Sequence, residues 1–436
     1  MTTDTVVLAG TRSVSIAALL KRHGIWIAAA AVMIALPKVF ASGAALTTLC
    51  LVGVMIVFSL SYNMLLGQTG MLSFGHAVYY GLGGFIAVHA MNAIAADKLP
   101  VPLPVLPLLG GVTGLVFGVL FGAVSTRRGG TVFAMISLGL GELIASLSLI
   151  LRSFFGGEEG VTADRTKMLA VWGVRFGPQI EVYYLIAAWC LACMVLMYAF
   201  TQTPLGRICN AVRDNPERAE FVGYSAQMVR FIVFSIAGFF AGVAGGLAAI
   251  NFELMNAINL SAAQSGVVLL TTFIGGVRHF AGPILGAIVV VVLQVFLSDL
   301  TGAWMLYFGL LFVVMVMFVP GGLAGLILMH LPLLRRRTLH RLLPHYALMS
   351  LPALLGAVGL VTLIETAHHQ LVKSATQGPA MRLFGVELES DEPLPWVAAL
   401  ALIAAGIVLG RAWAPRVSAA FDEAANGTVS RGRVGE

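Results

Sequence analysis

Charged residues are scarce in this chain: they make up 11% of its 436 residues, whereas hydrophobic residues make up 59%. A soluble globular domain carries roughly 25% charged residues. A soluble core of this size cannot hide so much apolar side chain, so part of the chain must face lipid. The composition excludes an ordinary soluble protein and predicts an integral membrane protein.

Motifs of soluble enzymes and of metal sites are also missing. Neither GxxxxGKS nor GxxxxGKT occurs, so we expect any ATP to bind a separate subunit. There is no GxSxG elbow and no cluster of His, Cys, Asp or Glu with metal-ligand spacing. No basic cluster is interleaved with aromatic residues, so no nucleic-acid partner is expected despite the net charge of +6. We predict that this chain binds no cofactor and no metal.

Long apolar runs dominate what is present. A helix that spans a bilayer needs about 20 mostly apolar residues. The run at 265–277 is too short to cross alone and ends at Gly275 and Gly276, so we interpret it as a broken or part-way helix, although it is counted as a crossing. The predicted fold class is all-α, a polytopic membrane helix bundle. The twelve predicted spans are about 24–41, 44–66, 76–96, 103–125, 130–151, 182–201, 229–251, 265–277, 283–298, 302–319, 346–364 and 396–413.

The distribution of basic residues predicts the orientation of these spans. With the N-terminus in the cytoplasm, most of the 26 Lys and Arg residues fall in cytoplasmic segments. This excess is what the positive-inside rule requires. The acidic stretch at 387–392 then lies outside. Both termini are predicted to be cytoplasmic.

Two of the spans carry glycine at four-residue spacing. Residues four apart share a helix face, and glycine lets two backbones approach closely in lipid. The stripes predict packing faces within a compact bundle, or a contact between subunits. They consist of Gly110, Gly114, Gly118 and Gly122 in one span and Gly238, Gly242 and Gly246 in the other.

Polar residues interrupt the apolar pattern at 63–76. Irregular backbone at membrane depth is tolerated only where protein buries it or where it lines a water-filled cavity. The segment is therefore a candidate for the solute path, and the alternative is an ordinary tight cytoplasmic turn. Glu142, in the middle of the fifth span, either belongs to the path or supports the fold from a helix contact. The path candidates are Asn63, Gln68, Ser73, His76 and Glu142.

The longest polar stretch on the predicted inner side, 203–230, contains the signals of a short helix. Asn215 is a good N-cap, and Pro216 fits the first helical position, where no N–H is missed. The two glutamates that follow lie near the positive end of the helix dipole. Gly223 fits the position just after the helix. A rigid two-turn helix on the cytoplasmic face is what a mechanical coupler to another protein needs.

Several ordered motifs resemble the branched-chain amino acid ABC permease family, specifically its larger membrane subunit. The spacing of Glu217, Ala219 and Gly223 is similar to the Glu-Ala-Ala-x-x-x-Gly coupling loop of ABC importer permeases. The resemblance covers about 20–328. Its matching stretches are 62–67, Gly70, 72–77, 81–84, 204–207, 211–220, 237–246, 275–276, 282–283, 286–287 and 320–325.

The resemblance implies a permease domain at 1–328, with about ten spans, in the bacterial inner membrane. It implies a second, different permease as partner, two cytoplasmic ATPases that hold ATP and Mg, and an external solute-binding protein. The solute is then a branched-chain amino acid or a related small polar solute, such as urea, an amide or an aromatic acid. The implied ATPase-coupling residues are Arg213, Asp214, Asn215, Pro216, Glu217, Ala219, Glu220 and Gly223.

The chain departs from the family pattern in two places. Arg278 and His279 follow the paired glycines, where the family usually has small residues. A C-terminal extension at 329–436 adds two spans and a cytoplasmic tail, as packing surface or as a partner contact.

Two questions stay open at this level. The external loop at 152–181 has mixed charges, which fit docking of a binding protein and plain solvation equally well. An ion-gradient-driven secondary transporter is the alternative function, and the near absence of charge within the spans disfavours it. A membrane enzyme lacks a catalytic constellation.

Overall fold

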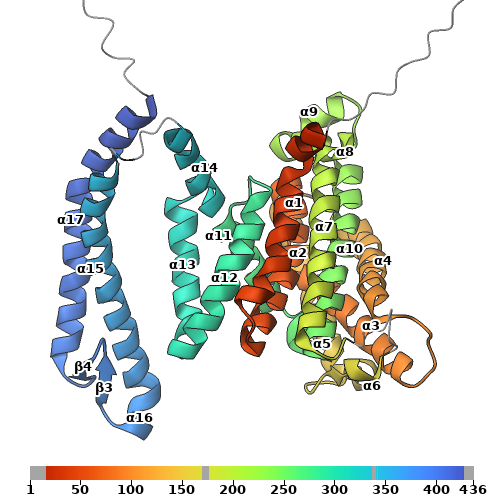
Figure 1. Cartoon of the computed structure of the whole chain (residues 1–436), viewed down its shortest axis with the longest axis horizontal. Coiled ribbons are helices and arrows are strands. Elements are labelled where there is room, and N and C mark those ends of the chain that lie inside the picture. The colour runs from red at the N-terminus through yellow and green to blue at the C-terminus, as the bar shows by residue number, and fades with distance from the viewer. Residues whose placement is uncertain (1–15, 169–175, 336–339, 341, 427–436) are drawn as a thin grey trace, which may run out of the picture. The chain divides into compact units, whose positions relative to one another are not determined.

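The computed structural model describes residues 16–168, 176–335, 340 and 342–426, and most of them are helical (Figure 1). The chain divides into two compact units, Met1–Leu269 and Leu270–Glu436. The predicted limit of the permease pattern at 328 remains a prediction. The helices are α1 (Ile16–Val39), α2 (Gly43–Thr69), α3 (Ala77–Ala95), α4 (Leu106–Ser125), α5 (Gly130–Ile150), α6 (Arg152–Phe155), α7 (Gln179–Gln202), α8 (Pro204–Asp214), α9 (Pro216–Phe221), α10 (Ala226–Phe252), α11 (Ala262–Gly275), α12 (Ala281–Leu300), α13 (Trp304–Phe318), α14 (Gly322–Arg335), α15 (Leu343–His368), α16 (Ser374–Gln377) and α17 (Pro393–Asn426).

Each of the twelve predicted spans corresponds to a helix. Within the described residues, nine helices are long and apolar enough to cross a membrane, or ten if α13 and α14, which meet at a 47° bend, form one broken span. The other two predicted spans correspond to α11 and to the apolar part of α1, Gly24–Val39, and both segments are shorter. The all-α polytopic class is confirmed, and α14 is a helix that the sequence did not predict.

The core of the first unit forms around α10, which packs against α2, α3 and α4. The glycine stripes explain how closely these helices approach. A Cβ on Gly114 would lie 2.1 Å from the carbonyl oxygen of Gly238, and one on Gly242 would lie 2.1 Å from that of Gly110. Any side chain at these positions would push α4 and α10 apart. The predicted packing faces are confirmed as contacts within one chain.

Two short antiparallel ladders complete the secondary structure. Strand β1 (Val161–Thr162) pairs with β2 (Leu254–Met255) in the first unit, with Val161 opposite Met255. Strand β3 (Ala380–Leu383) pairs with β4 (Val386–Glu389) in the second unit. The first ladder fastens the loop after α6 to the end of α10.

In the second unit, the paired-glycine motif meets the motif that begins at Pro320. Gly276 has φ of +111°, and a Cβ on it would lie 2.3 Å from the carbonyl oxygen of Gly321. Gly275 packs equally closely against Gly282. Two motifs about 45 residues apart in the sequence therefore form one glycine-lined junction between α11, α12 and α14.

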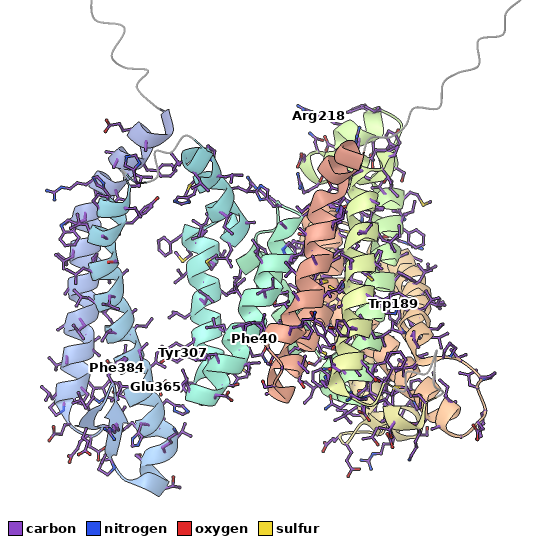
Figure 2. All side chains as sticks on the ribbon, in the orientation of Figure 1. Phe40, Trp189, Arg218, Tyr307, Glu365 and Phe384 are labelled. Carbon is purple, nitrogen blue, oxygen red and sulfur yellow. The ribbon has the colours of Figure 1, made fainter. Side chains whose placement is uncertain are left out.

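The C-terminal extension is a helical hairpin of α15 and α17, which run side by side (Figure 1). The two helices approach closely at Gly359, where an added Cβ would lie only 2.7 Å from the carbonyl oxygen of Ala399. Tyr307 of α13 donates to Glu365 of α15 at 3.0 Å (Figure 2). Near the start of α15, Tyr346 shares a 2.7 Å hydrogen bond with His330 of α14. The extension thus packs on the last helices of the matching region.

Candidate functional site

The polar stretch after α7 folds as two short helices, and the second has the predicted cap. Asn215, with φ of −158° and ψ of 99°, lies between α8 and α9. Its Oδ1 accepts a hydrogen bond of 2.9 Å from the backbone N–H of Arg218. Pro216 occupies the first helical position, as expected. The cap and the start of the helix are confirmed, whereas α8 is a separate amphipathic helix that the sequence analysis missed.

The end of α9 also follows its sequence signal. Gly223 has φ of +93°, a left-handed conformation that costs glycine little. Its N–H donates to the carbonyl of Glu220 at 2.9 Å, and that of Tyr224 donates to Ala219 at 3.1 Å. This pair of bonds is a Schellman motif, which satisfies the last carbonyls of the helix. Residues 204–223 thus form the α8–α9 knob, whose second helix is capped at both ends.

The surface of this knob combines charge with apolar side chains. Glu217, Arg218 and Glu220 are exposed, whereas Ala219 is buried. Phe221 is 89% exposed and Val222 is 75% exposed. These two side chains give an otherwise polar element an exposed apolar edge. The sequence analysis did not single out Phe221 and Val222, although two bulky apolar residues just before Gly223 in a polar loop were a readable signal.

Arg213 connects the knob to the helix bundle. It forms an ion pair with Asp214, with Nε and Oδ1 2.9 Å apart. Its Nη1 also donates to the carbonyl of Gly67, in the last turn of α2. The side chain passes against Gly70, which has φ of +69° and ends α2. A cation at a helix C-terminus is stabilised by the unpaired carbonyls there.

The chain between α2 and α3, residues 70–76, is irregular and mostly buried. The hydroxyl of Tyr62 donates to the carbonyl of Ser73 at 3.0 Å. The N–H of Phe74 donates to Ser137 of α5 at 3.1 Å, and that of Ala77 donates to Ser265 of α11 at 2.9 Å. This break between α2 and α3, residues 70–76, is thus held inside the protein by side chains from two other helices. Such burial does not fit an exposed tight turn.

Four of the path candidates lie in the last two turns of α2 or in the break that follows it. His76 is fully buried, shares a 2.9 Å hydrogen bond with Ser61 through Nε2, and stacks on Phe58 with ring centroids 5.7 Å apart. Each of the four has a buried polar atom that lacks a hydrogen-bond partner among the described residues. These atoms are Asn63 Oδ1, Gln68 Oε1, Ser73 Oγ and His76 Nδ1. Buried polar groups of a native protein are normally satisfied, so water, a solute or another chain must serve these atoms.

The fifth candidate, Glu142, lies next to the break but faces the other way. Its neighbour Gly141 packs on the break, where a Cβ would lie 3.1 Å from Cα of Gly75. Glu142 itself is on the exposed face of α5. In the part of the chain that the structure describes, its carboxylate has no ion-pair partner. Because a charge at the bilayer centre costs at least about 2.5 kcal/mol, this face belongs against protein or water.

At the opposite end of the first unit, Arg165 of the loop after α6 is a structural residue. Its Nε lies 3.2 Å from Glu253 Oε1, and its guanidinium donates to the carbonyls of Ile250 and Asn251 at 3.3 Å. It also donates to Gln179 of α7 at 2.9 Å. Arg165 thus holds the loop onto the ends of α7 and α10, and its charge is used internally.

The remaining charges of that loop are exposed. Glu158 and Glu159 are at the surface, and the exposed Lys167 lies 3.5 Å from Asp164. Hydrogen bonds from the side chain and backbone of Thr166 lower the pKa of Asp164. Arg175 lies outside the described residues. The charges at the surface of this loop are thus accessible to solvent and to another protein.

Comparison with known proteins identifies the chain's relatives. It is 26% identical over 289 residues to the high-affinity branched-chain amino acid transport system permease protein LivM of Escherichia coli, covering 62% of this chain and 67% of LivM. It is 24% identical over 283 residues to BraD of Pseudomonas aeruginosa, a permease protein of the same kind of system, covering 62% of this chain and 91% of BraD.

A more distant similarity links the chain to a sugar permease. It is 24% identical over 211 residues to the ribose import permease protein RbsC of Haemophilus influenzae, covering 46% of this chain and 62% of RbsC. No solved structure matches. These relatives support an importer permease and not the ion-gradient alternative. The family model described as branched-chain amino acid transport system / permease component matches residues 44–327, and the chain is therefore a member of that family of ABC transporter permeases.

Proposed function

We propose that this permease subunit is moved by a separate ATPase that docks on the knob α8–α9. The observation that carries the proposal is the contact of Arg213 with the last turn of α2, directly before the break at 70–76. A push on the knob reaches the break through this side chain. Two such ATPases would hold ATP and Mg, because this chain has no phosphate-binding loop of its own.

The charge distribution supports a cytoplasmic position for the knob. The end of the first unit with α8 and α9 (Figure 1) carries Arg127, Arg128, Arg207, Arg213, Arg218 and Arg230. At the opposite end, acidic residues are at least as frequent as basic ones among the described residues. Under the positive-inside rule, the arginine-rich end faces the cytoplasm. Both termini are then cytoplasmic, in a bacterial inner membrane.

The chemistry of the break supports a small zwitterionic or polar solute. The four unsatisfied atoms in the break and in the last two turns of α2 belong to two amides, a hydroxyl and an imidazole. Such groups hydrogen-bond to ammonium and carboxylate groups alike. We propose branched-chain amino acids or related small polar compounds as the solute, because the names of LivM and BraD give that class. A second permease would cover the face of α5 that carries Glu142, and an external binding protein would deliver the solute.

The test of ATPase docking is a pair of surface substitutions on the knob. Glu217→Lys and Phe221→Ala change side chains that project away from the bundle, so we expect the chain to fold and insert normally. ATPase association should weaken by about tenfold or more, because docking energy concentrates in a few exposed anchors. The measurement is co-purification of the ATPase together with solute uptake in vesicles. Glu159→Lys, an exposed carboxylate at the opposite end, is the matched control. Unchanged association in both knob variants would remove the basis for the coupling role.

A further inference from the structure

A hollow of about 290 Å³ lies where the end of α4 meets the start of α10. Arg127, Ser225 and Gln227 provide its polar lining, and Met228 and Phe231 are among its apolar residues. Pockets for drug-sized ligands measure about 300–1,000 Å³, so this hollow has room for a small head group and little more. Three of its lining residues, Ser225, Gln227 and Met228, follow directly after the knob, and none of its lining residues belongs to the break or to the knob itself.

The positive charge at the hollow is not neutralised by the protein. Arg127 is exposed, and its Nε donates to the carbonyl of Ala123 at 3.1 Å, which leaves its other N–H groups directed elsewhere. Arg230 lies close to Gly129, two residues after Arg127: a Cβ added to Gly129 would lie 2.9 Å from the guanidinium carbon of Arg230. In the described part of the chain, neither arginine forms an ion pair with a carboxylate. The hollow therefore attracts an anion.

An apolar stripe leads away from the hollow along α4. Its side chains are exposed and recur at helical spacing, so they share one face with Ala123 and Arg127. A charged site that opens onto a continuous apolar face fits an amphiphile, with its head at the arginine and its chains on the helix. The stripe consists of Val112 (48% exposed), Val116 (57%), Val119 (44%) and Leu120 (58%).

We propose that this hollow binds the phosphate head group of an anionic phospholipid, with Arg127 and Gln227 as donors and the acyl chains along the α4 stripe. Basic pockets between membrane helices bind such head groups, and each arginine near the surface contributes to the attraction. Phosphate chemistry alone would also fit free phosphate. The apolar stripe favours the lipid, because acyl chains can pack on it whereas a free phosphate ion gains nothing from an apolar surface.

Native mass spectrometry of the full-length chain, purified with phosphatidylglycerol or phosphatidylcholine, tests the proposal. We expect the chain to retain phosphatidylglycerol and not phosphatidylcholine. Arg127→Gln should lower retention by about fivefold, the value of one arginine near an anionic surface. The matched control is Arg207→Gln, which removes an exposed arginine on α8 at the same end. Equal losses of phosphatidylglycerol in the two variants would mean that the lipid is attracted by the general positive charge of this end, and would overturn the proposed site.

A second variant tests whether the shape of the hollow matters independently of its positive charge. Ala123 is exposed and lines the hollow, so Ala123→Phe fills it without altering any charge. We expect this variant to lose the lipid as well, and full retention would overturn the proposal. Inorganic phosphate in excess should not displace the lipid; displacement would assign the site to free phosphate. Retained lipid together with lost ATPase association in Arg127→Gln would assign the hollow to a protein contact instead.

Discussion

At the residue scale, glycine decides how closely the helices of the first unit pack. Gly110, Gly114, Gly238 and Gly242 place the backbones of α4 and α10 in direct contact. Association of helices in lipid depends on such packing, because lipid tails are as apolar as leucine and no hydrophobic force drives helices together. The polar residues of the break rely on this packing, since α3 also lies against α10.

The close packing of α4 and α10 can be tested by adding one methyl group to a glycine at their contact. Gly114→Ala would place its Cβ 2.1 Å from the carbonyl oxygen of Gly238, which real structures do not allow without a shift. We expect a loss of about 1–3 kcal/mol in the free energy of unfolding, the usual cost of overpacking. Gly139→Ala is the matched control, because nothing lies within 4 Å of a Cβ there. The measurement is the thermal unfolding of the purified chain, and equal midpoints for the two variants would contradict the packing argument.

At the element scale, α8–α9 separates two tasks. Phe221, Val222 and Glu217 are exposed, whereas Arg213, which solvent also reaches, contacts the last turn of α2. The caps at Asn215 and Gly223 satisfy backbone groups at both ends of α9, which favours transmission of a displacement along that helix. In the proposed coupling, docking and transmission would therefore depend on different side chains of one small element.

Arg213→Ala should separate these tasks. The variant removes the hydrogen bond to Gly67 and the ion pair to Asp214 but leaves the outer surface of the knob intact. We expect normal ATPase association with uptake reduced by about tenfold, since a charge-assisted hydrogen bond contributes about 1.5–3 kcal/mol. Arg207→Ala, on the same helix without that contact, serves as the control. A parallel loss of association and uptake in Arg213→Ala would show that Arg213 belongs to the docking surface.

At the scale of the whole molecule, the chain consists of a family-matched part and an extension. The match ends at residue 327, whereas α15 begins at Leu343. The extension is attached through hydrogen bonds such as Tyr307 to Glu365 and His330 to Tyr346, and its own two helices pack closely on each other. The knob and the break both lie in the first unit, which contains no part of the extension.

Truncation after residue 342 tests whether the extension is needed for the transport machinery. We expect the shortened chain to insert and to bind its ATPase as before, because the knob and its contact with α2 are untouched. Its thermal stability should fall, because side chains on α13 and α14 lose their partners. ATPase co-purification and thermal unfolding are the two measurements. Loss of ATPase association in a chain that still folds would show that the extension takes part in assembly.

Sequence alone determined the twelve apolar helices that it predicted as spans and the ends of α9, but not α8 or α14, because hydropathy and capping depend on residues that are neighbours along the chain. The capping residues Asn215, Pro216 and Gly223 affect only backbone groups a few positions away. The apolar runs predicted every long helix. Only the tertiary structure decided that Arg213 reaches Gly67, that Glu142 faces outward, and that Arg165 is used internally. It also decided that four polar side chains in the last two turns of α2 and in the break are buried with unsatisfied polar atoms. The physical reason is that such contacts depend on partners up to about 190 residues away, as for Ala77 and Ser265, and no local pattern encodes which helices meet.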